Sequence, residues 1–215
     1  MEGNYKTVKH PGSDELIEKR SRFVADVVPV STEAEALAHL DAVRKAHPQA
    51  NHHVYAYILR ENNLMRYSDD GEPSSTAGIP TLDVLRKQGL TDVCAVVTRY
   101  FGGTLLGTGG LVRAYSGACK AGVIAAEPVE KQICDRVELE ASYALSGKIE
   151  YIINQEGHTI EKIDYGVQVE MALLCEAEKT DALIQKIIDA TGALCVPRKA
   201  GVTYMDKPIL LKEED

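Results

Sequence analysis

The sequence lacks the features that most directly assign a protein to a membrane or to an oxidising compartment. It contains no apolar run long enough to span a bilayer, and no positively charged segment followed by an apolar one near its start. Its five cysteines are an odd number and include no C-x-x-C pair, which is typical of free thiols in a reducing compartment. We therefore expect a cytoplasmic protein that does not bind membranes.

Residue groups spaced for metal binding or nucleophilic catalysis are missing as well. The adjacent His52 and His53 lie in a predicted strand, so their side chains should point to opposite faces and cannot both hold one metal ion. One of them remains available to a binding site. We predict no metal ligands, no cofactor and no catalytic residues.

Positive charge is scarce in the second part of the chain. Residues 1–128 carry 14 basic and 15 acidic side chains, whereas residues 129–215 carry 10 and 17. Phosphate contacts dominate nucleic-acid affinity, so this acidic part is a poor nucleic-acid surface and we expect no DNA partner. Any contact with RNA would need a local basic patch in the first part.

What is present indicates an ordinary globular protein. The 215 residues are 45% hydrophobic and 26% charged, which allows one large domain or two small ones. In the first part, alternation and helical spacing predict several elements. The expected strands are Tyr5–Val8, Ser21–Val28, 51–59 and Leu64–Tyr67, with a turn at residues 10–13. Two helices are expected. The first begins with a capping box, in which Ser31 or Thr32 is the N-cap and Glu35 its partner, and it ends before His47. The second is short and covers Thr81–Gln88.

The most informative stretch is a buried strand, a glycine-rich segment and a helix. Val93–Val97 is short, apolar and β-branched, as in a strand that is covered on both faces. Five glycines follow within nine residues and permit positive φ angles or close backbone approach. These glycines are Gly102, Gly103, Gly107, Gly109 and Gly110. We call residues Arg99–Gly110 the glycine loop.

Two interpretations fit the glycine loop. Backbone N–H groups at Thr108–Gly110 could bind a phosphate or carboxylate, with Arg99 and Arg113 adding charge-assisted contacts. Alternatively, the glycines let the helix pack tightly on the sheet, and the arginines pair with acids or stack on Tyr100 and Tyr115.

The known phosphate-binding fingerprints do not fit this loop. A P-loop needs Lys and Ser or Thr after its second glycine, but Gly107 is followed by Thr108 and Gly109. The dinucleotide pattern fails as well, because Val112 stands where its third glycine belongs.

A second irregular segment is rich in carboxylates, and we call residues Asp69–Gly78 the acidic loop. Asp69, Asp70 and Glu72 could bind Mg²⁺ or act as general acid and base. The alternative is a tight turn in which the aspartates accept backbone hydrogen bonds. Nearer the start, Arg22 lies in a basic cluster with Lys19 and Arg20 that either contacts phosphate or is a solvated strand edge.

Beyond Pro128 the pattern changes and gives the order βαββαβ, which is the ferredoxin-like arrangement. The predicted strands are Arg136–Ser142, Thr159–Tyr165, Val167–Cys175 and Leu194–Tyr204, and the helices are Leu145–Gln155 and Glu178–Ala190.

Several segments together resemble a known family. The main ones are Ser68–Pro73, Thr76–Pro80 and Val97–Tyr115, and the lesser ones are Lys19–Phe23 and His47–His53. They are similar to the signature of the IMPACT/YigZ family, whose bacterial members pair an IMPACT domain with a small ferredoxin-like domain. The resemblance implies an α+β protein. Residues 1–128 would form a ribosomal protein S5 domain 2-like domain, and residues 129–215 a ferredoxin-like domain similar to the last domain of elongation factor G.

The resemblance also implies a role in translation, which is an argument from fold analogy. We predict a non-catalytic regulator that binds RNA, the ribosome or a translation-linked protein. The alternative is an enzyme, a Mg²⁺-dependent hydrolase or transferase that uses the acidic loop. In either case the acidic loop and the glycine loop should face each other. The predicted ligand-binding residues are Arg22, His52, Asp69, Asp70, Glu72, Thr76, Gly78, Arg99, Tyr100, Gly102, Gly103, Gly107, Gly109, Gly110 and Arg113.

Overall fold

The computed structural model describes residues 3–211 and has an α+β fold with two antiparallel sheets and five α-helices. The chain divides into two compact units. The N-terminal unit comprises Tyr5–Glu130 and the residues from Lys207 onward, and the C-terminal unit comprises Lys131–Asp206 and the residues before Tyr5. None of the helices within residues 3–211 is long and apolar enough to cross a membrane.

The N-terminal unit contains a five-stranded sheet of order β2-β3-β6-β4-β5. The pairs β2–β3, β3–β6, β6–β4 and β4–β5 are all antiparallel. The strands are β2 (Gly12–Glu18), β3 (Ser21–Pro29), β4 (His52–Leu59), β5 (Leu64–Ser68) and β6 (Val93–Tyr100). The short strand β1 (Tyr5–Val8) and the 3₁₀ turn Glu61–Asn63 complete the elements before β5. The predicted strand β6 is therefore the central one, and it is buried almost throughout.

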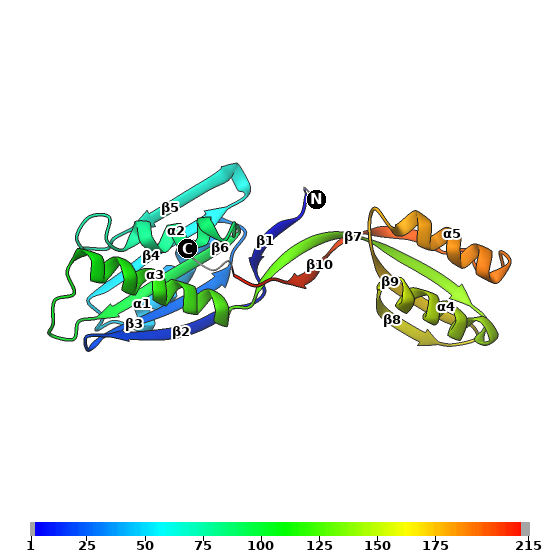
Figure 1. Cartoon of the computed structure of the whole chain (residues 1–215), viewed down its shortest axis with the longest axis horizontal. Helices are drawn as coiled ribbons and strands as arrows, with labels where there is room; N and C mark the ends of the chain where they lie inside the picture. The colour runs from blue at the N-terminus through cyan, green and yellow to red at the C-terminus, as the bar shows by residue number, and fades with distance from the viewer. Residues whose placement is uncertain (1–2, 212–215) are drawn as a thin grey trace. The chain divides into compact units, whose positions relative to one another are not determined.

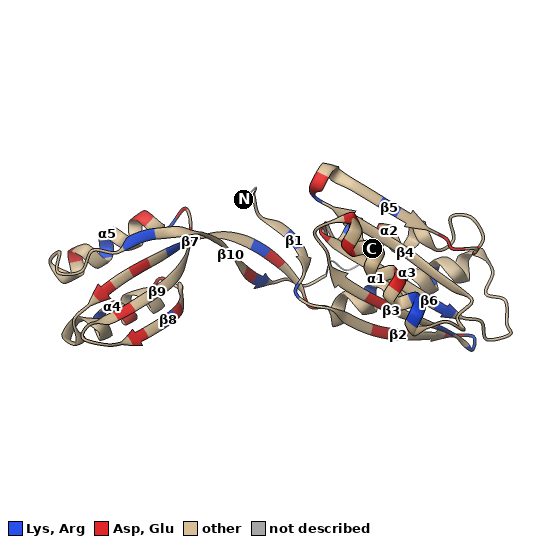
Figure 2. Ribbon diagram, turned by 180° about the vertical axis from the view of Figure 1, so that it is seen from behind, with Lys and Arg blue, Asp and Glu red and all other residues tan. Residues whose placement is uncertain are grey.

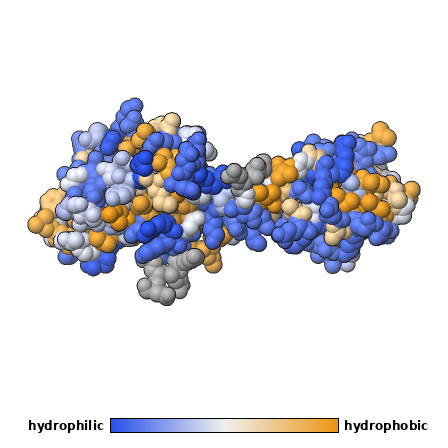
Figure 3. Space-filling view, turned by 90° about the horizontal axis from the view of Figure 1, so that it is seen from above, coloured by the Kyte–Doolittle hydropathy of each residue, from blue (hydrophilic) through white to orange (hydrophobic). Residues whose placement is uncertain are grey.

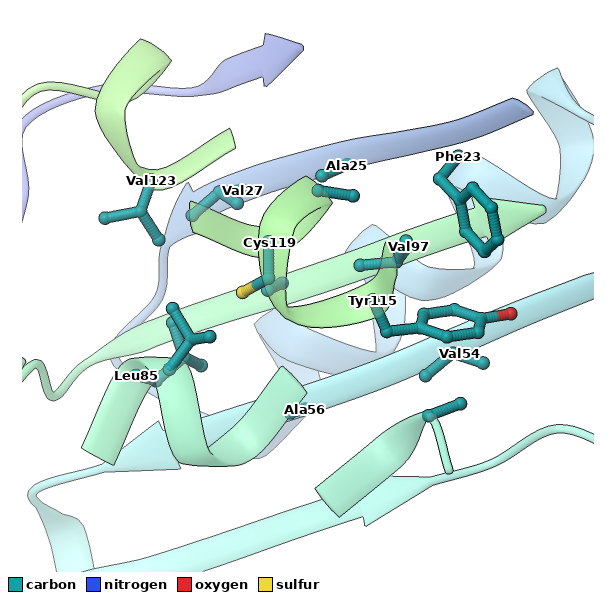
Figure 4. Packing of buried hydrophobic residues seen from close by; sticks show 14 of the residues in the cluster. Phe23, Ala25, Val27, Val54, Ala56, Leu85, Val97, Tyr115, Cys119 and Val123 are labelled. Carbon is teal, nitrogen blue, oxygen red and sulfur yellow. The ribbon is translucent and has the colours of Figure 1, made fainter. Parts of the chain in front are cut away.

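Helices cover both faces of this sheet. The helices α2 (Gly78–Lys87) and α3 (Thr108–Ala125) pack on one face and contribute to the larger apolar core. In this core the rings of Tyr115 and Phe23 pack edge to face, with their centres 5.1 Å apart (Figure 4). The helix α1 (Glu33–Ala46) packs on the opposite face through Ala36, Leu40 and Val43. Because β6 is apolar on both faces, it can take this central position between the helical layers.

The start of α1 confirms the capping prediction. Thr32 is the N-cap and its Oγ1 accepts from the Glu35 N–H at 3.2 Å, while the Glu35 carboxylate accepts from the Ser31 N–H at 2.6 Å. The helix ends at Ala46 with His47 as its C-cap, also as predicted.

Two elements of the N-terminal unit differ from the prediction. Residues 12–18 form the edge strand β2 rather than a connection, and their mostly exposed polar side chains give no alternating apolar signal. The helix α2 begins at Gly78 instead of Thr81. Its first turn includes Pro80, which is tolerated where backbone N–H groups have no partner within the helix.

The C-terminal unit follows the predicted order βαββαβ. Its elements are β7 (Pro128–Ala141), α4 (Tyr143–Gln155), β8 (Thr159–Tyr165), β9 (Val169–Glu176), α5 (Thr180–Thr191) and β10 (Arg198–Pro208). The strands of this unit lie in the order β10-β7-β9-β8. Apolar side chains of both helices and of β7 and β9 form one core. The last strand starts at Arg198 rather than Leu194, consistent with Pro197 having no N–H to donate.

Candidate functional site

Three connections of the N-terminal unit meet at one end of its sheet. Arg99 near the end of β6 stands opposite Phe23 at the start of β3 and His52 at the start of β4. The glycine loop, the β2–β3 turn and the acidic loop all leave the sheet at this end (Figure 1). The antiparallel register therefore brings together segments that lie far apart in the sequence.

A buried ion pair joins the glycine loop to the acidic loop. The Arg99 guanidinium donates from Nη1 to Glu72 Oε1 at 2.5 Å, and both side chains are less than a tenth exposed. The Tyr115 hydroxyl of α3 donates to the same carboxylate oxygen at 2.8 Å. Burial and the neighbouring Glu72 carboxylate raise the pKa of Tyr115, so its phenol stays protonated. Glu72 thus connects the two loops and the helix.

Two more predicted residues support the acidic loop, His52 from β4 and Thr76 from within the loop. The His52 ring donates from Nδ1 to the Asp70 carbonyl at 2.8 Å, and its Nε2 lies 3.8 Å from Glu72 Oε1. Thr76 is buried, and its hydroxyl donates to the Pro73 carbonyl at 2.6 Å. The two adjacent histidines do point to opposite faces, since His53 lies against the His47 carbonyl instead.

Asp69 acts as a cap for α2 from a distance in sequence. Its carboxylate accepts hydrogen bonds from the N–H groups of Ser75 at 2.9 Å, Ala77 at 3.1 Å and Gly78 at 2.8 Å. This explains why the helix begins earlier than its local sequence indicates. Gly78 is required here because a Cβ at this position would lie 2.8 Å from the Ser68 backbone.

We predict that Asp69→Ala lowers the stability of the N-terminal unit by about 1–2 kcal/mol, the cost of removing a helix cap. Asp69→Asn should lose less, since its amide oxygen can still accept from Ala77 and Gly78. Urea unfolding of the full chain measures both. Equal losses of unfolding free energy in the two variants would show that the capping oxygen of Asp69 does not stabilise the unit.

Asp70 is also used within the fold. Its Oδ2 accepts from the His53 backbone N–H at 2.6 Å, and its Oδ1 lies 3.4 Å from the Arg44 guanidinium. All three carboxylates of the acidic loop therefore accept hydrogen bonds: Asp69 from within the loop, and Asp70 and Glu72 from other parts of the N-terminal unit. The tight-turn interpretation describes Asp69 and Asp70, and Glu72 holds Arg99 in place.

The glycine loop lies against the β2–β3 turn. The Gly102 N–H donates to Ser21 Oγ at 3.1 Å, and a Cβ on Gly102 would overlap the Arg20 backbone carbonyl. Gly103 and Gly107 instead have φ angles of +80° and +71° with open space around them. The close approach of two backbones is thus required at Gly102, whereas left-handed conformations account for the other two.

The helix α3 begins within the last residues of this loop, at Thr108, with Gly107 as its N-cap. Gly107 has no side chain that could accept a hydrogen bond from the first turn. Gly110 fits closely against Leu106, and Gly109 faces the Arg113 guanidinium, whose Nη1 is 3.5 Å from a Cβ built on that glycine. Arg113 therefore folds back over the first turn of its own helix.

The outer surface at this end combines cations with apolar side chains. Lys19, Arg20 and Arg113 are exposed and form no ion pair with any residue of the described range 3–211. Figure 2 shows the β2–β3 turn in blue. Phe101 and Leu105 of the glycine loop are 45% and 83% exposed, and Figure 3 shows hydrophobic side chains at this end of the unit.

Arg22 and Tyr100 lie next to this surface but already have partners. Arg22 forms an ion pair with Glu15 at 2.6 Å, and its guanidinium lies 5.8 Å from the centre of the Tyr100 ring. The Tyr100 hydroxyl and His47 Nδ1 are 2.8 Å apart.

No three His, Cys, Asp or Glu side chains of residues 3–211 are placed to hold a metal ion. All five cysteines are free and buried. Burial raises the pKa of the Cys94 and Cys119 thiols to about 12, so neither is a thiolate near neutral pH.

Most of this chain is similar in sequence to known proteins. Residues 19–123 match the Impact N-terminal domain, and residues 139–193 match a domain of unknown function, DUF1949. The IMPACT family member YvyE of Bacillus subtilis is 37% identical over 207 residues, which cover 96% of this chain and 95% of YvyE. The chain belongs to the IMPACT family. The IMPACT family member YigZ of Escherichia coli is 34% identical over 174 residues, or 80% of this chain and 85% of YigZ.

Two further similarities of this IMPACT family protein are to a protein matched over part of the chain and to a solved structure whose title gives no function. The protein IMPACT homolog of Dictyostelium discoideum is 38% identical over 98 residues, or 43% of this chain and 28% of that protein. A solved structure titled "Crystal structure of an hypothetical protein" has a TM-score of 0.58 and 29% identity, covering 94% of this chain and 99% of its own.

Sequence reasoning missed two members of the buried network. Ser21 accepts from the Gly102 N–H, and Tyr115 donates to Glu72. Both residues lie within the segments that resemble the IMPACT/YigZ signature, but nothing in their spacing indicates these contacts. Only the folded unit brings β3, the acidic loop and α3 to the same point.

Proposed function

We propose that this IMPACT family protein is a non-catalytic, translation-associated protein that binds RNA, either free or in the ribosome. The proposed contact surface consists of Lys19, Arg20, Phe101, Leu105 and Arg113. The observation that carries this proposal is the set of three exposed cations, none of which has an acidic partner within residues 3–211, beside an exposed aromatic ring. Unpaired cations attract phosphate, and aromatic rings stack on unpaired bases.

We propose different roles for Arg99, the first residue of the glycine loop, and Arg113, which lies just after the loop. Arg99 is 5% exposed and its charge is balanced by Glu72, so we propose that it supports the surface without touching RNA. Arg113 is exposed and takes the role of phosphate contact. The three carboxylates of the acidic loop accept hydrogen bonds of the fold, and this favours a structural role for them over acid–base or Mg²⁺ chemistry.

The fold supports a connection with translation by analogy. We propose that the N-terminal unit has the ribosomal protein S5 domain 2-like fold and the C-terminal unit a ferredoxin-like fold similar to the last domain of elongation factor G. The strand order β10-β7-β9-β8 supports the second assignment. A role on the ribosome would place the protein in the cytoplasm.

The test is sedimentation with purified ribosomes and binding to a fluorescent oligouridine over a salt series. A triple variant with Lys19, Arg20 and Arg113 each changed to Gln should bind more weakly. The slope of the logarithm of the binding constant against the logarithm of the salt concentration should fall in magnitude by about 2. The matched control, Arg66→Gln, Lys87→Gln and Lys120→Gln, removes the same charge elsewhere on the unit. An equal loss in the control, or no loss in the first variant, would contradict the proposal.

A further inference from the structure

One face of the C-terminal sheet is not covered by the helices of its own unit. The odd-numbered residues of β7 and β9, such as Leu139 and Met171, pack into the core with α4 and α5. Side chains alternate along a strand, so the even-numbered residues point to the other face. A hollow of about 420 Å³ lies there. Its polar lining comes from β7, β8, β9 and β10: Arg136, Glu138, Glu140, Lys162, Asp164, Glu170 and Arg198.

Three carboxylates form a row across this open face. Glu140 on β7 stands opposite Glu170 on β9, and Glu170 stands opposite Asp164 on β8. Like charges directly opposite each other on neighbouring strands are unfavourable. Figure 2 shows the acidic residues of these three strands in red.

The cations in the hollow neutralise only one member of this row, Asp164. Lys162 pairs with Asp164 at 2.5 Å, and Arg198 pairs with Glu138 at 3.2 Å. Arg136 lies 3.0 Å from Glu161. Glu140 and Glu170 are exposed and form no ion pair within the described residues, so two adjacent carboxylates face the hollow without a salt-bridge partner.

The chemistry of this face favours a cationic occupant of extended shape. Residues 131–206 carry 8 basic and 13 acidic side chains, so the phosphates of a nucleic acid would be repelled. The carboxylates do not form a metal-binding group among residues 3–211. A hollow spread over four strands suits several side chains of a peptide segment.

We propose that the open face of the C-terminal sheet binds a lysine- or arginine-rich segment of a protein partner. Glu140 and Glu170 receive the partner's cationic side chains, and Ala172 between Glu138 and Lys162 leaves room for an aliphatic stem. This binding is separate from the proposed RNA contact, because it uses only residues of the C-terminal unit and a surface of opposite charge.

The test measures binding of a fluorescent oligolysine peptide to the full chain by anisotropy. Glu140→Gln with Glu170→Gln should weaken binding about fivefold, as expected for the loss of two exposed ion pairs. Glu150→Gln with Glu178→Gln is the matched control, since it makes the same charge change on α4 and in the β9–α5 connection. Equal weakening in both variants would overturn the proposal.

A variant that strengthens binding separates the proposal from damage to the fold. Lys162→Ala removes the cation that competes for Asp164, so oligolysine should bind about twofold more tightly. Weaker or unchanged binding in this variant would contradict the assigned face. Tighter binding of an oligouridine than of oligolysine, lost in the Glu140→Gln and Glu170→Gln variant, would assign the face to RNA and overturn the peptide proposal.

Discussion

Glu72→Ala should be among the most destabilising single substitutions in the N-terminal unit, lowering its unfolding free energy by about 3–5 kcal/mol. The variant leaves the Arg99 guanidinium buried without its counter-charge, and the Tyr115 hydroxyl without its acceptor. Urea unfolding of the full chain, combined with hydrogen exchange at β6 and α3, measures the loss. A loss below about 1 kcal/mol, as for an exposed ion pair, would show that the buried pair is not needed.

A double-mutant cycle tests whether loss of the Arg99–Glu72 ion pair causes this destabilisation. Arg99→Met alone leaves Glu72 buried without its cation, so it should also be strongly destabilising. The other single variant of the cycle is Glu72→Gln. Glu72→Gln with Arg99→Met removes both charges and should cost clearly less than the sum of the Glu72→Gln and Arg99→Met variants, because a buried pair can be replaced with little loss. Additive losses would mean that the two side chains act independently. Glu15→Ala, which breaks the exposed pair with Arg22, is the control and should cost less than about 1 kcal/mol.

Gly102→Ala should produce the second large effect, and it should affect both stability and binding. A Cβ at this position overlaps the Arg20 backbone carbonyl, so the glycine loop and the β2–β3 turn must move apart. We expect a loss of about 3 kcal/mol, at the upper end of the usual cost of overpacking. Because Arg20 and Phe101 then separate, binding to oligouridine should also fall. Thermal unfolding and the oligouridine titration measure the two consequences.

Two neighbouring glycines serve as controls for this prediction. A Cβ added at Gly103 has no atom within 4 Å. We expect Gly103→Ala to lower the unfolding free energy by about 1 kcal/mol, because of the φ angle of +80° alone. Gly109→Ala lies in the first turn of α3 with ordinary φ and should leave stability equal or slightly higher. If Gly102→Ala were no worse than Gly103→Ala, close packing of the two backbones would not be its function.

The elements with a local signal were predictable from the sequence. Thr32 and Glu35 mark the start of α1 because a capping box involves only residues close in sequence. The strand β6 and the order βαββαβ follow from apolar periodicity, which burial imposes on each element. The edge strand β2 has no such periodicity and was missed, because its pairing with β3 depends on backbone hydrogen bonds and not on side-chain pattern.

The start of α2 shows why other features could not be read in this way. The local sequence offers no N-cap side chain at Ala77, and the capping carboxylate belongs to Asp69, eight residues earlier. A hydrogen bond over that separation depends on the path of the acidic loop, which only the folded unit defines.

The sequence by itself determined the family, the α+β class and which segments carry the candidate site, because these depend on periodicity and on motifs within short stretches. The tertiary structure alone decided what the charged residues of that site do. It pairs Arg99 with Glu72 in the interior and leaves Arg113 exposed, although both arginines flank the same loop. The reason is physical: whether a charge is buried and balanced or exposed and available depends on residues from distant segments, here β6, the acidic loop and α3.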